Sequence, residues 1–148
     1  MNQLGQEEAG FRLLVEIVMV AFIMVIIYSV ITQVDSWRWK ISEKSLFDGF
    51  QRALNSPDGS IIVQKDLVFA KGASYSNRAL AGSVTGIGFE CIEIQANESI
   101  AFSLYENSMV ELTTQLQTDV YYTCLQGDGE DGCKYHCIVS FGKDLAEE

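Results

Sequence analysis

FRLLVEIVMVAFIMVIIYSVIT, the run from Phe11 to Thr32, is the most informative stretch of this 148-residue protein. Between Ile17 and Ile31 it holds no charged residue, and Ser29 is its one small polar residue. The segment from Leu13 to Thr32 has roughly 20 residues, and at a rise of about 1.5 Å per residue a helix of that length crosses a hydrocarbon core of about 30 Å. The run therefore predicts a transmembrane helix.

Glu16 is the only charged residue inside this run after Arg12. A carboxylate about one turn into an apolar helix is costly unless it lies at the lipid interface, is protonated or has a partner. Arg12, four residues earlier on the same helix face, could pair with it near the lipid surface. A group on a neighbouring subunit could also be its partner, as in helices that assemble into a bundle or filament, and the sequence leaves both readings open.

The apolar run is better explained as a retained anchor than as a cleaved signal peptide. The preceding residues, MNQLGQEEAG, contain no Lys or Arg, the run exceeds the usual apolar region of about 7 to 15 residues, and no small-residue cleavage site follows it. Two signals conflict on orientation. The flank with Arg38, Lys40 and Lys44 would be cytoplasmic by the positive-inside rule, whereas four cysteines favour an oxidising compartment. We follow the cysteines and predict an extracytoplasmic domain.

The formal net charge is −10, and residues 79–133 contain no Lys or Arg at all. Such a surface repels phosphate backbones, so nucleic-acid binding is not expected. An acidic surface also keeps an exposed domain in solution, which requires no ligand. Beyond the membrane segment about 115 residues remain, which is enough for one small domain with a modest core.

The helix is predicted to continue from the membrane to Leu54, because Gly49 is the only Gly or Pro between residues 33 and 54. Its apolar residues form an imperfect helical stripe: Val34, Trp37, Ile41, Leu46, Phe50 and Leu54. The sequence Asn55-Ser56-Pro57-Asp58-Gly59 ends it, since Pro disfavours helix in the residue before it. A break near Asp35 is the alternative.

After Gly59 the pattern is typical of short strands separated by turns. The expected strands are Ser60–Gln64, Asp66–Ala70, Phe89–Gln95, Ser99–Tyr105, Met109–Gln117, Asp119–Leu125 and Cys133–Phe141. Lys71–Gly88 reads as a loop with one helical turn near Asn77–Gly82. Alternation of apolar and polar residues implies that one sheet face is buried, and the amphipathic helix is its simplest cover.

The predicted fold is therefore α+β: a long N-terminal transmembrane helix continues into an amphipathic helix, and a small antiparallel β-sheet domain packs on it. Residues 1–10 form a leader or short N-terminal segment, residues 11–54 the helix, and residues 55–148 an extracytoplasmic β-rich domain.

The four cysteines lie in the β region and allow three disulfide pairings. If QGDGEDG is the tip of a hairpin, Cys124 and Cys133 stand at its two ends and could face each other, which leaves Cys137 to reach Cys91. Zinc is the alternative, with His136 beside Cys137, but the spacing Cys-x8-Cys-x2-His-Cys matches no standard finger or ribbon. We predict disulfides and no metal.

No catalytic chemistry is visible. The sequence has no glycine-rich phosphate loop, and His136 is its only histidine, at a position expected to be exposed on a strand, so no nucleophile and base pair can be named. We expect neither an enzyme nor a cofactor. Asn97-Glu98-Ser99 is a glycosylation sequon, which fits an extracytoplasmic face.

The first 50 or so residues resemble a type IV pilin or pilin-like protein, most closely an archaeal one. The resemblance rests on a short polar leader that ends in Gly10, then Phe11 and an apolar helix with the early Glu16, and then a small β domain. It implies that a peptidase cuts between Gly10 and Phe11, that the helices pack together, and that Glu16 meets the N-terminus of a neighbouring subunit at Phe11 and Arg12.

This sequence departs from the pilin pattern in two respects. The glutamate stands one residue further from the cut than is usual, and the leader lacks basic residues. A second candidate cut lies between Gly5 and Gln6, similar to the Gln that follows the cut in some archaeal pilins.

Two functions are consistent with these features. The first is a structural, pilin-like subunit of a filament or other membrane-anchored assembly at the cell surface, with the membrane and copies of itself or pilin-like proteins as partners. The second is a single-span, membrane-anchored binding module or accessory subunit of a larger membrane complex.

Overall fold

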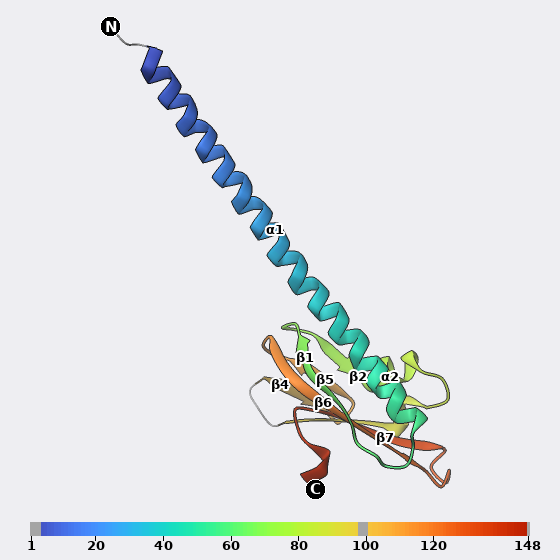
Figure 1. Cartoon of the computed structure of the whole chain (residues 1–148). Coiled ribbons are helices and arrows are strands. Elements are labelled where there is room, and N and C mark those ends of the chain that lie inside the picture. Colours follow the sequence, from blue (N-terminus) through green and yellow to red (C-terminus); the bar gives the residue numbers. More distant parts are fainter. Residues whose placement is uncertain (1–3, 98–100, 148) are drawn as a thin grey trace. The chain divides into compact units, whose positions relative to one another are not determined.

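The computed structural model describes residues 4–97 and 101–147 of the chain (Figure 1). It comprises two compact units, Met1–Arg38 and Trp39–Glu148. One helix, α1 (Leu4–Asn55), supplies the first unit and the beginning of the second.

The first unit consists of the N-terminal part of α1. It contains the apolar run, with a mean hydropathy of 2.8, and its length and composition suffice to cross a membrane. None of that window is buried inside the structure. The helix starts at Leu4, so the described part of the predicted leader is helical, and it passes through Asp35 without the break considered as an alternative.

The second unit joins the last turns of α1 to the β domain. Its other described elements are β1 (Ile62–Phe69), β2 (Ser74–Ser76), α2 (Asn77–Ser83), η1 (Phe89–Cys91), β3 (Ile92–Ala96), β4 (Phe102–Tyr105), β5 (Met109–Leu112), β6 (Leu116–Gln126), β7 (Tyr135–Phe141) and η2 (Leu145–Glu147). The α+β class predicted from sequence is confirmed. The helix ends at Asn55, one residue beyond the predicted Leu54, and the helical turn predicted near Asn77–Gly82 is present as α2.

The strands form two sheets, in the orders β1-β6-β7-β3 and β2-β5-β4. Among the described strands, every neighbouring pair is antiparallel except β3 and β7, which run parallel with Ile92 opposite Cys137. The first sheet is therefore mixed, whereas the prediction was an antiparallel sheet. Because β4, β5 and β6 lie between β3 and β7 in the chain, no hairpin turn imposes an antiparallel direction on this pair.

The helix covers the sheets, as expected, and the predicted apolar stripe is confirmed in part. Leu46 and Phe50 are buried in the same core as strand residues, whereas Ile41 is 66% exposed. The residues of α1 that face inward are Ser42, Leu46, Gly49, Phe50 and Ala53. Their spacing of three and four residues keeps them on one side of a helix with 3.6 residues per turn, and Ile41 falls off that side.

Ser42 is the polar member of the buried helix face. Its hydroxyl oxygen accepts a hydrogen bond from the Val68 amide of β1 at 2.9 Å, so the helix satisfies a backbone donor at the sheet edge. The two strands predicted around Lys65 are one strand with an irregularity between Gln64 and Leu67. Asp66 has a φ of 58° there, and its amide donates to the Asp119 carboxylate at 2.8 Å.

Gly49 lies where the helix packs closely against the first sheet. A Cβ atom at this position would stand 2.7 Å from Gln64 Cγ and 2.7 Å from Tyr122 Cε2. Tyr122, on β6, is completely buried, and its hydroxyl has no hydrogen-bond partner among the described residues. The absence of a side chain on Gly49 therefore allows this packing.

The predicted strand Met109–Gln117 is also divided. The residues 113–115 between β5 and β6 leave the strand conformation, and β5 and β6 belong to different sheets. The interruption at residues 113–115 is therefore the place where the chain passes from one sheet to the other.

Candidate functional site

The residues expected to mediate assembly lie on the first unit. Phe11 is 69% exposed, and the side chains of Arg12 and Glu16 are exposed as well. Glu16 lines a shallow groove of about 310 Å³ with Leu13, Ile17 and Val20. In the described part of the chain Glu16 and Arg12 form no ion pair, so the carboxylate stands among apolar side chains without a partner from its own helix.

The candidate cleavage positions lie within α1. Gly10 and Phe11 have helical backbone, and no atom of the described side chains lies within 4 Å of the position that a Cβ on Gly10 would occupy. The alternative pair, Gly5 and Gln6, is also helical, but its side chains fall outside the described residues. Cleavage at either place stays a prediction.

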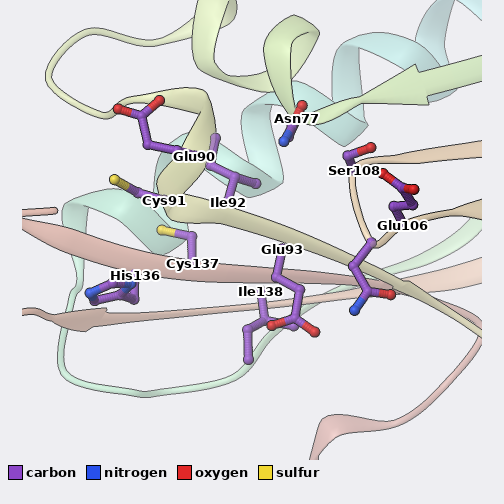
Figure 2. Close-up of a pocket in the computed structure, with 11 residues that line it drawn as sticks. Asn77, Glu90, Cys91, Ile92, Glu93, Glu106, Ser108, His136, Cys137 and Ile138 are labelled. Atoms are coloured by element: carbon purple, nitrogen blue, oxygen red, sulfur yellow. The ribbon is translucent and has the colours of Figure 1, made fainter. Parts of the chain in front are cut away.

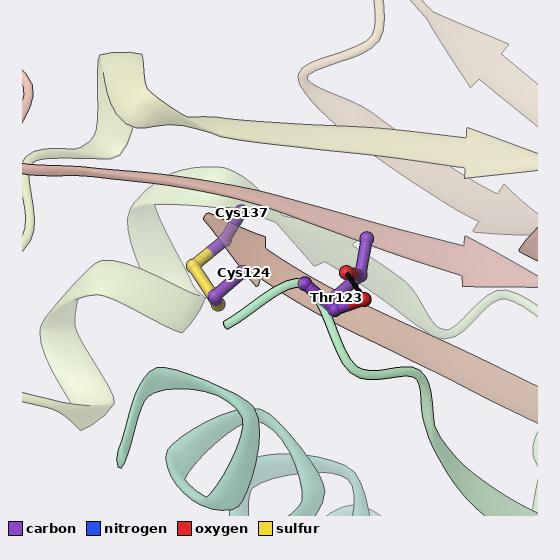
Figure 3. Close-up of a disulfide and its surroundings, with 4 residues drawn as sticks. Thr123, Cys124 and Cys137 are labelled. Carbon is purple, nitrogen blue, oxygen red and sulfur yellow. Dashed lines mark hydrogen bonds between the residues drawn. A yellow bond between two sulfur atoms is a disulfide. The ribbon is translucent and has the colours of Figure 1, made fainter. Parts of the chain in front are cut away.

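All four cysteines form disulfides, as predicted, but the predicted pairing is wrong. Cys91 is bonded to Cys133, with Cα atoms 5.7 Å apart. Cys124 is bonded to Cys137, with Cα atoms 4.1 Å apart, and Figure 3 shows this second bond. The prediction had joined Cys91 to Cys137 and Cys124 to Cys133.

The register of the β6–β7 hairpin explains the difference. Its last pair is Gln126 opposite Tyr135, which places Cys124 directly opposite Cys137 within the ladder. Directly opposed residues on antiparallel strands bring their Cβ atoms within bonding range of a disulfide. Cys133 lies in the turn beyond the ladder and bonds to Cys91 at the end of η1.

The Cys124–Cys137 disulfide lies next to the chain segment that leaves α1. The Thr123 hydroxyl donates to the Gly59 carbonyl at 3.1 Å, and the Gly59 amide donates to the Cys124 carbonyl at 3.0 Å (Figure 3). These bonds tie the segment after the helix to β6. Two disulfides in a domain of this size indicate an oxidising compartment.

The β domain has a depression of about 420 Å³ that the sequence did not reveal (Figure 2). Its side chains come from α2, η1, β3, the β4–β5 turn and β7, and they include Asn77, Ser108 and three glutamates, Glu90, Glu93 and Glu106. Among residues 4–97 and 101–147, no Lys or Arg lines it. The one available signal was the absence of Lys and Arg between residues 79 and 133.

The glutamate side chains are distributed along the depression and do not converge on one point (Figure 2). In the described residues no group of three His, Cys, Asp or Glu side chains is arranged to hold a metal ion. His136, expected to be an exposed strand residue, is exposed on β7 and lines the same depression. Both nearby cysteines, Cys91 and Cys137, are in disulfides and are not thiolate ligands.

A groove of about 340 Å³ adjoins the depression and shares Asn77 and Ser108 with it. Two exposed rings line the groove, Phe89 at 43% exposure and Tyr105 at 46%. The Arg78 guanidinium lies 4.9 Å from the centre of the Phe89 ring, so one face of that ring already has a cation on it.

The candidate glycosylation site is partly described. Asn97 is exposed, and its amide donates to the Phe141 carbonyl at 2.9 Å, which fixes its backbone beside β7. Glu98 and Ser99, the rest of the sequon, lie outside the described residues.

The chain matches no known family model, no curated protein and no solved structure. What the structure itself defines is a long apolar N-terminal helix followed by a small, disulfide-bonded β domain. The helix indicates membrane anchoring, and the disulfides indicate an oxidising environment for the domain.

Proposed function

We propose that this protein is a pilin-like structural subunit of a filament or other membrane-anchored assembly at the cell surface. Its N-terminal helix would pack against copies of itself or pilin-like partners, and its β domain would form the outer surface. The observation that carries the proposal is the exposed Glu16 carboxylate among the apolar side chains of a long helix, with no partner on its own chain in the described residues.

A second subunit would remove two free-energy penalties at once, one for Glu16 and one for Arg12. A carboxylate left in lipid is expensive, and Arg12 can reach it only by giving up its own route to the headgroups. A cationic or polar group from a neighbouring helix satisfies Glu16 while Arg12 keeps its contact with the lipid surface. If the chain is cut after Gly10, the new amino group at Phe11 is such a cation.

The test is to replace Glu16 by Gln in the full chain and to examine assembly and insertion separately. Glu16→Gln should shorten filaments seen by electron microscopy, because polar contacts in membranes contribute about 1 to 2 kcal/mol and every subunit would lose one. Alkali extraction should still find the protein in the membrane, and both disulfides should form.

Asp35→Asn is the matched control, since it removes an exposed carboxylate from the same helix outside the apolar run. It should leave filaments unchanged. Wild-type assembly by Glu16→Gln and Glu16→Ala, together with impaired insertion by Arg12→Ala, would show that Glu16 serves only its own helix. Mass spectrometry of the mature protein should find an N-terminus at Phe11, or at Gln6 if the second cut is used.

The alternative function is a single-span binding module or accessory subunit, and the 420 Å³ depression on the β domain favours it. In that case the helix is only an anchor. The mature protein would keep Met1, and gentle detergent extraction would yield single copies or a complex with unrelated membrane proteins.

A further inference from the structure

We propose that the depression and the adjoining aromatic groove bind the outward face of α1 from a second copy of this chain, through Lys40, Ile41 and Lys44. The inference rests on the proposed assembly function and deepens it, because it names a contact between the second units that is separate from the packing of the apolar helices.

The donor face is defined by its exposure. Lys40 and Lys44 are exposed and four residues apart, which places them on one side of the helix with about 6 Å between them along the axis. Ile41, beside them, is 66% exposed. The opposite side of the helix, with Leu46 and Phe50, is buried in the domain's own core, so the lysine side is turned away from it.

The acceptor surface is the depression, and its negative charge is opposite to that of the lysines on the donor face. Glu90, Glu93 and Glu106 line the depression from η1, β3 and the β4–β5 turn, and no described Lys or Arg lines it. Because their side chains are spread along the depression, as Figure 2 shows, they suit a partner that presents cations at intervals. A helix with lysines one turn apart is such a partner, whereas a single metal ion would need ligands that converge.

The aromatic groove supplies an apolar contact next to these charges. Phe89 and Tyr105 are large, exposed and adjacent to the depression, and exposed apolar side chains gathered in one place mark interaction surfaces. Ile41 is the matching apolar residue between the two lysines of the donor face. Arg78 is the one Lys or Arg among the described residues that line the groove, and it lies over the Phe89 ring.

The arrangement permits repetition. Donor and acceptor are different surfaces of one chain, so a subunit that gives its helix face to one neighbour can receive the helix face of another. Such head-to-tail contacts add subunits without limit when they do not close into a ring. This agrees with the growth of a filament.

Charge reversal in trans tests the contact in the full-length protein in membranes. The donor variant is Lys40→Glu/Lys44→Glu and the acceptor variant is Glu93→Lys/Glu106→Lys. A carbodiimide joins carboxylates to amines that are in contact, and mass spectrometry locates the bond. Wild-type protein should give bonds between Lys40 or Lys44 and Glu93 or Glu106 of different copies.

Each variant alone lacks one of the two groups that the carbodiimide joins, so it should give no bond between these positions, and the mixture of the two variants is the informative sample. Mixing the two variants should restore the yield, because each then presents the charge that the other lacks. Asp128→Lys/Asp131→Lys, which reverses two exposed carboxylates in the β6–β7 turn outside the depression, is the matched control and should cross-link like the wild type. Mixing the donor variant with Glu93→Gln/Glu106→Gln, which supplies no amine, should give no bond, and disulfide mapping should confirm that every variant has folded.

The outcomes separate this contact from the proposed function. If the wild type forms filaments and the donor and acceptor variants form them equally well, the docking contact is wrong but the proposed filament function is retained. If the wild type gives neither filaments nor bonds between copies, both are wrong. If the donor variant loses only its binding to vesicles of anionic phospholipid, the lysines bind lipid headgroups and the docking contact is again wrong.

Discussion

Gly49→Ala should destabilise the second unit, although alanine is ordinarily the better helix former. The new methyl group would stand 2.7 Å from two side-chain carbons, one of them in the completely buried ring of Tyr122. Overpacking of this kind costs about 1 to 3 kcal/mol, and the gain in helix propensity returns up to about 1 kcal/mol. Because a buried ring has no free space into which it can move, we expect a net loss of about 1 to 2 kcal/mol.

The measurement is urea or thermal unfolding of the full chain in detergent, monitored by the near-ultraviolet circular dichroism of the tyrosines. The loss corresponds to a melting temperature lower by roughly 4 °C per kcal/mol. Gly82→Ala is the control, since Gly82 also lies in a helix and a Cβ there would meet nothing within 4 Å. It should be neutral or slightly stabilising. If Gly49→Ala is as stable as the wild type, or moves in the same direction as Gly82→Ala, the close approach of helix and sheet is wrong.

Two further predictions concern the disulfides and alkaline pH. Replacing Cys91 and Cys133 by Ala should lower the free energy of unfolding by about 4 kcal/mol, and replacing Cys124 and Cys137 by about 3 kcal/mol, because the two bonds join residues 42 and 13 positions apart. A lower urea midpoint for the Cys124 and Cys137 variant than for the Cys91 and Cys133 variant would contradict this order. Burial, and then the negative charge of Glu43, raise the pKa of Tyr75 to about 12. The unfolded chain therefore loses this proton first, so stability that is complete below about pH 10 should fall as the pH rises toward 12. Tyr75→Phe should make the urea midpoint fall less steeply with pH over that range. Because burial also raises the pKa of Tyr122, part of the pH dependence should persist in this variant. A pH dependence equal to that of the wild type would refute the role of Tyr75.

Features set by neighbouring residues in the chain could be predicted from the sequence. The apolar run, the end of the helix before Pro57 and the short strands after Gly59 follow from composition, backbone chemistry and alternation, which act over a few residues. The presence of disulfides also followed, since four cysteines in one small domain suit an oxidising compartment.

Features that depend on alignment between distant segments were decided by the tertiary structure. The predicted cysteine pairing was wrong because it depended on a hairpin register that only the β6–β7 ladder sets, with Cys124 opposite Cys137. Two other features depend likewise on the groups that the opposing surface presents. They are the parallel pairing of β3 with β7 and the burial of Ser42, whose hydroxyl accepts from the Val68 amide, in place of Ile41. The acidic depression is assembled from elements spread over 60 or so residues, and no local pattern records that its glutamates lie on one surface.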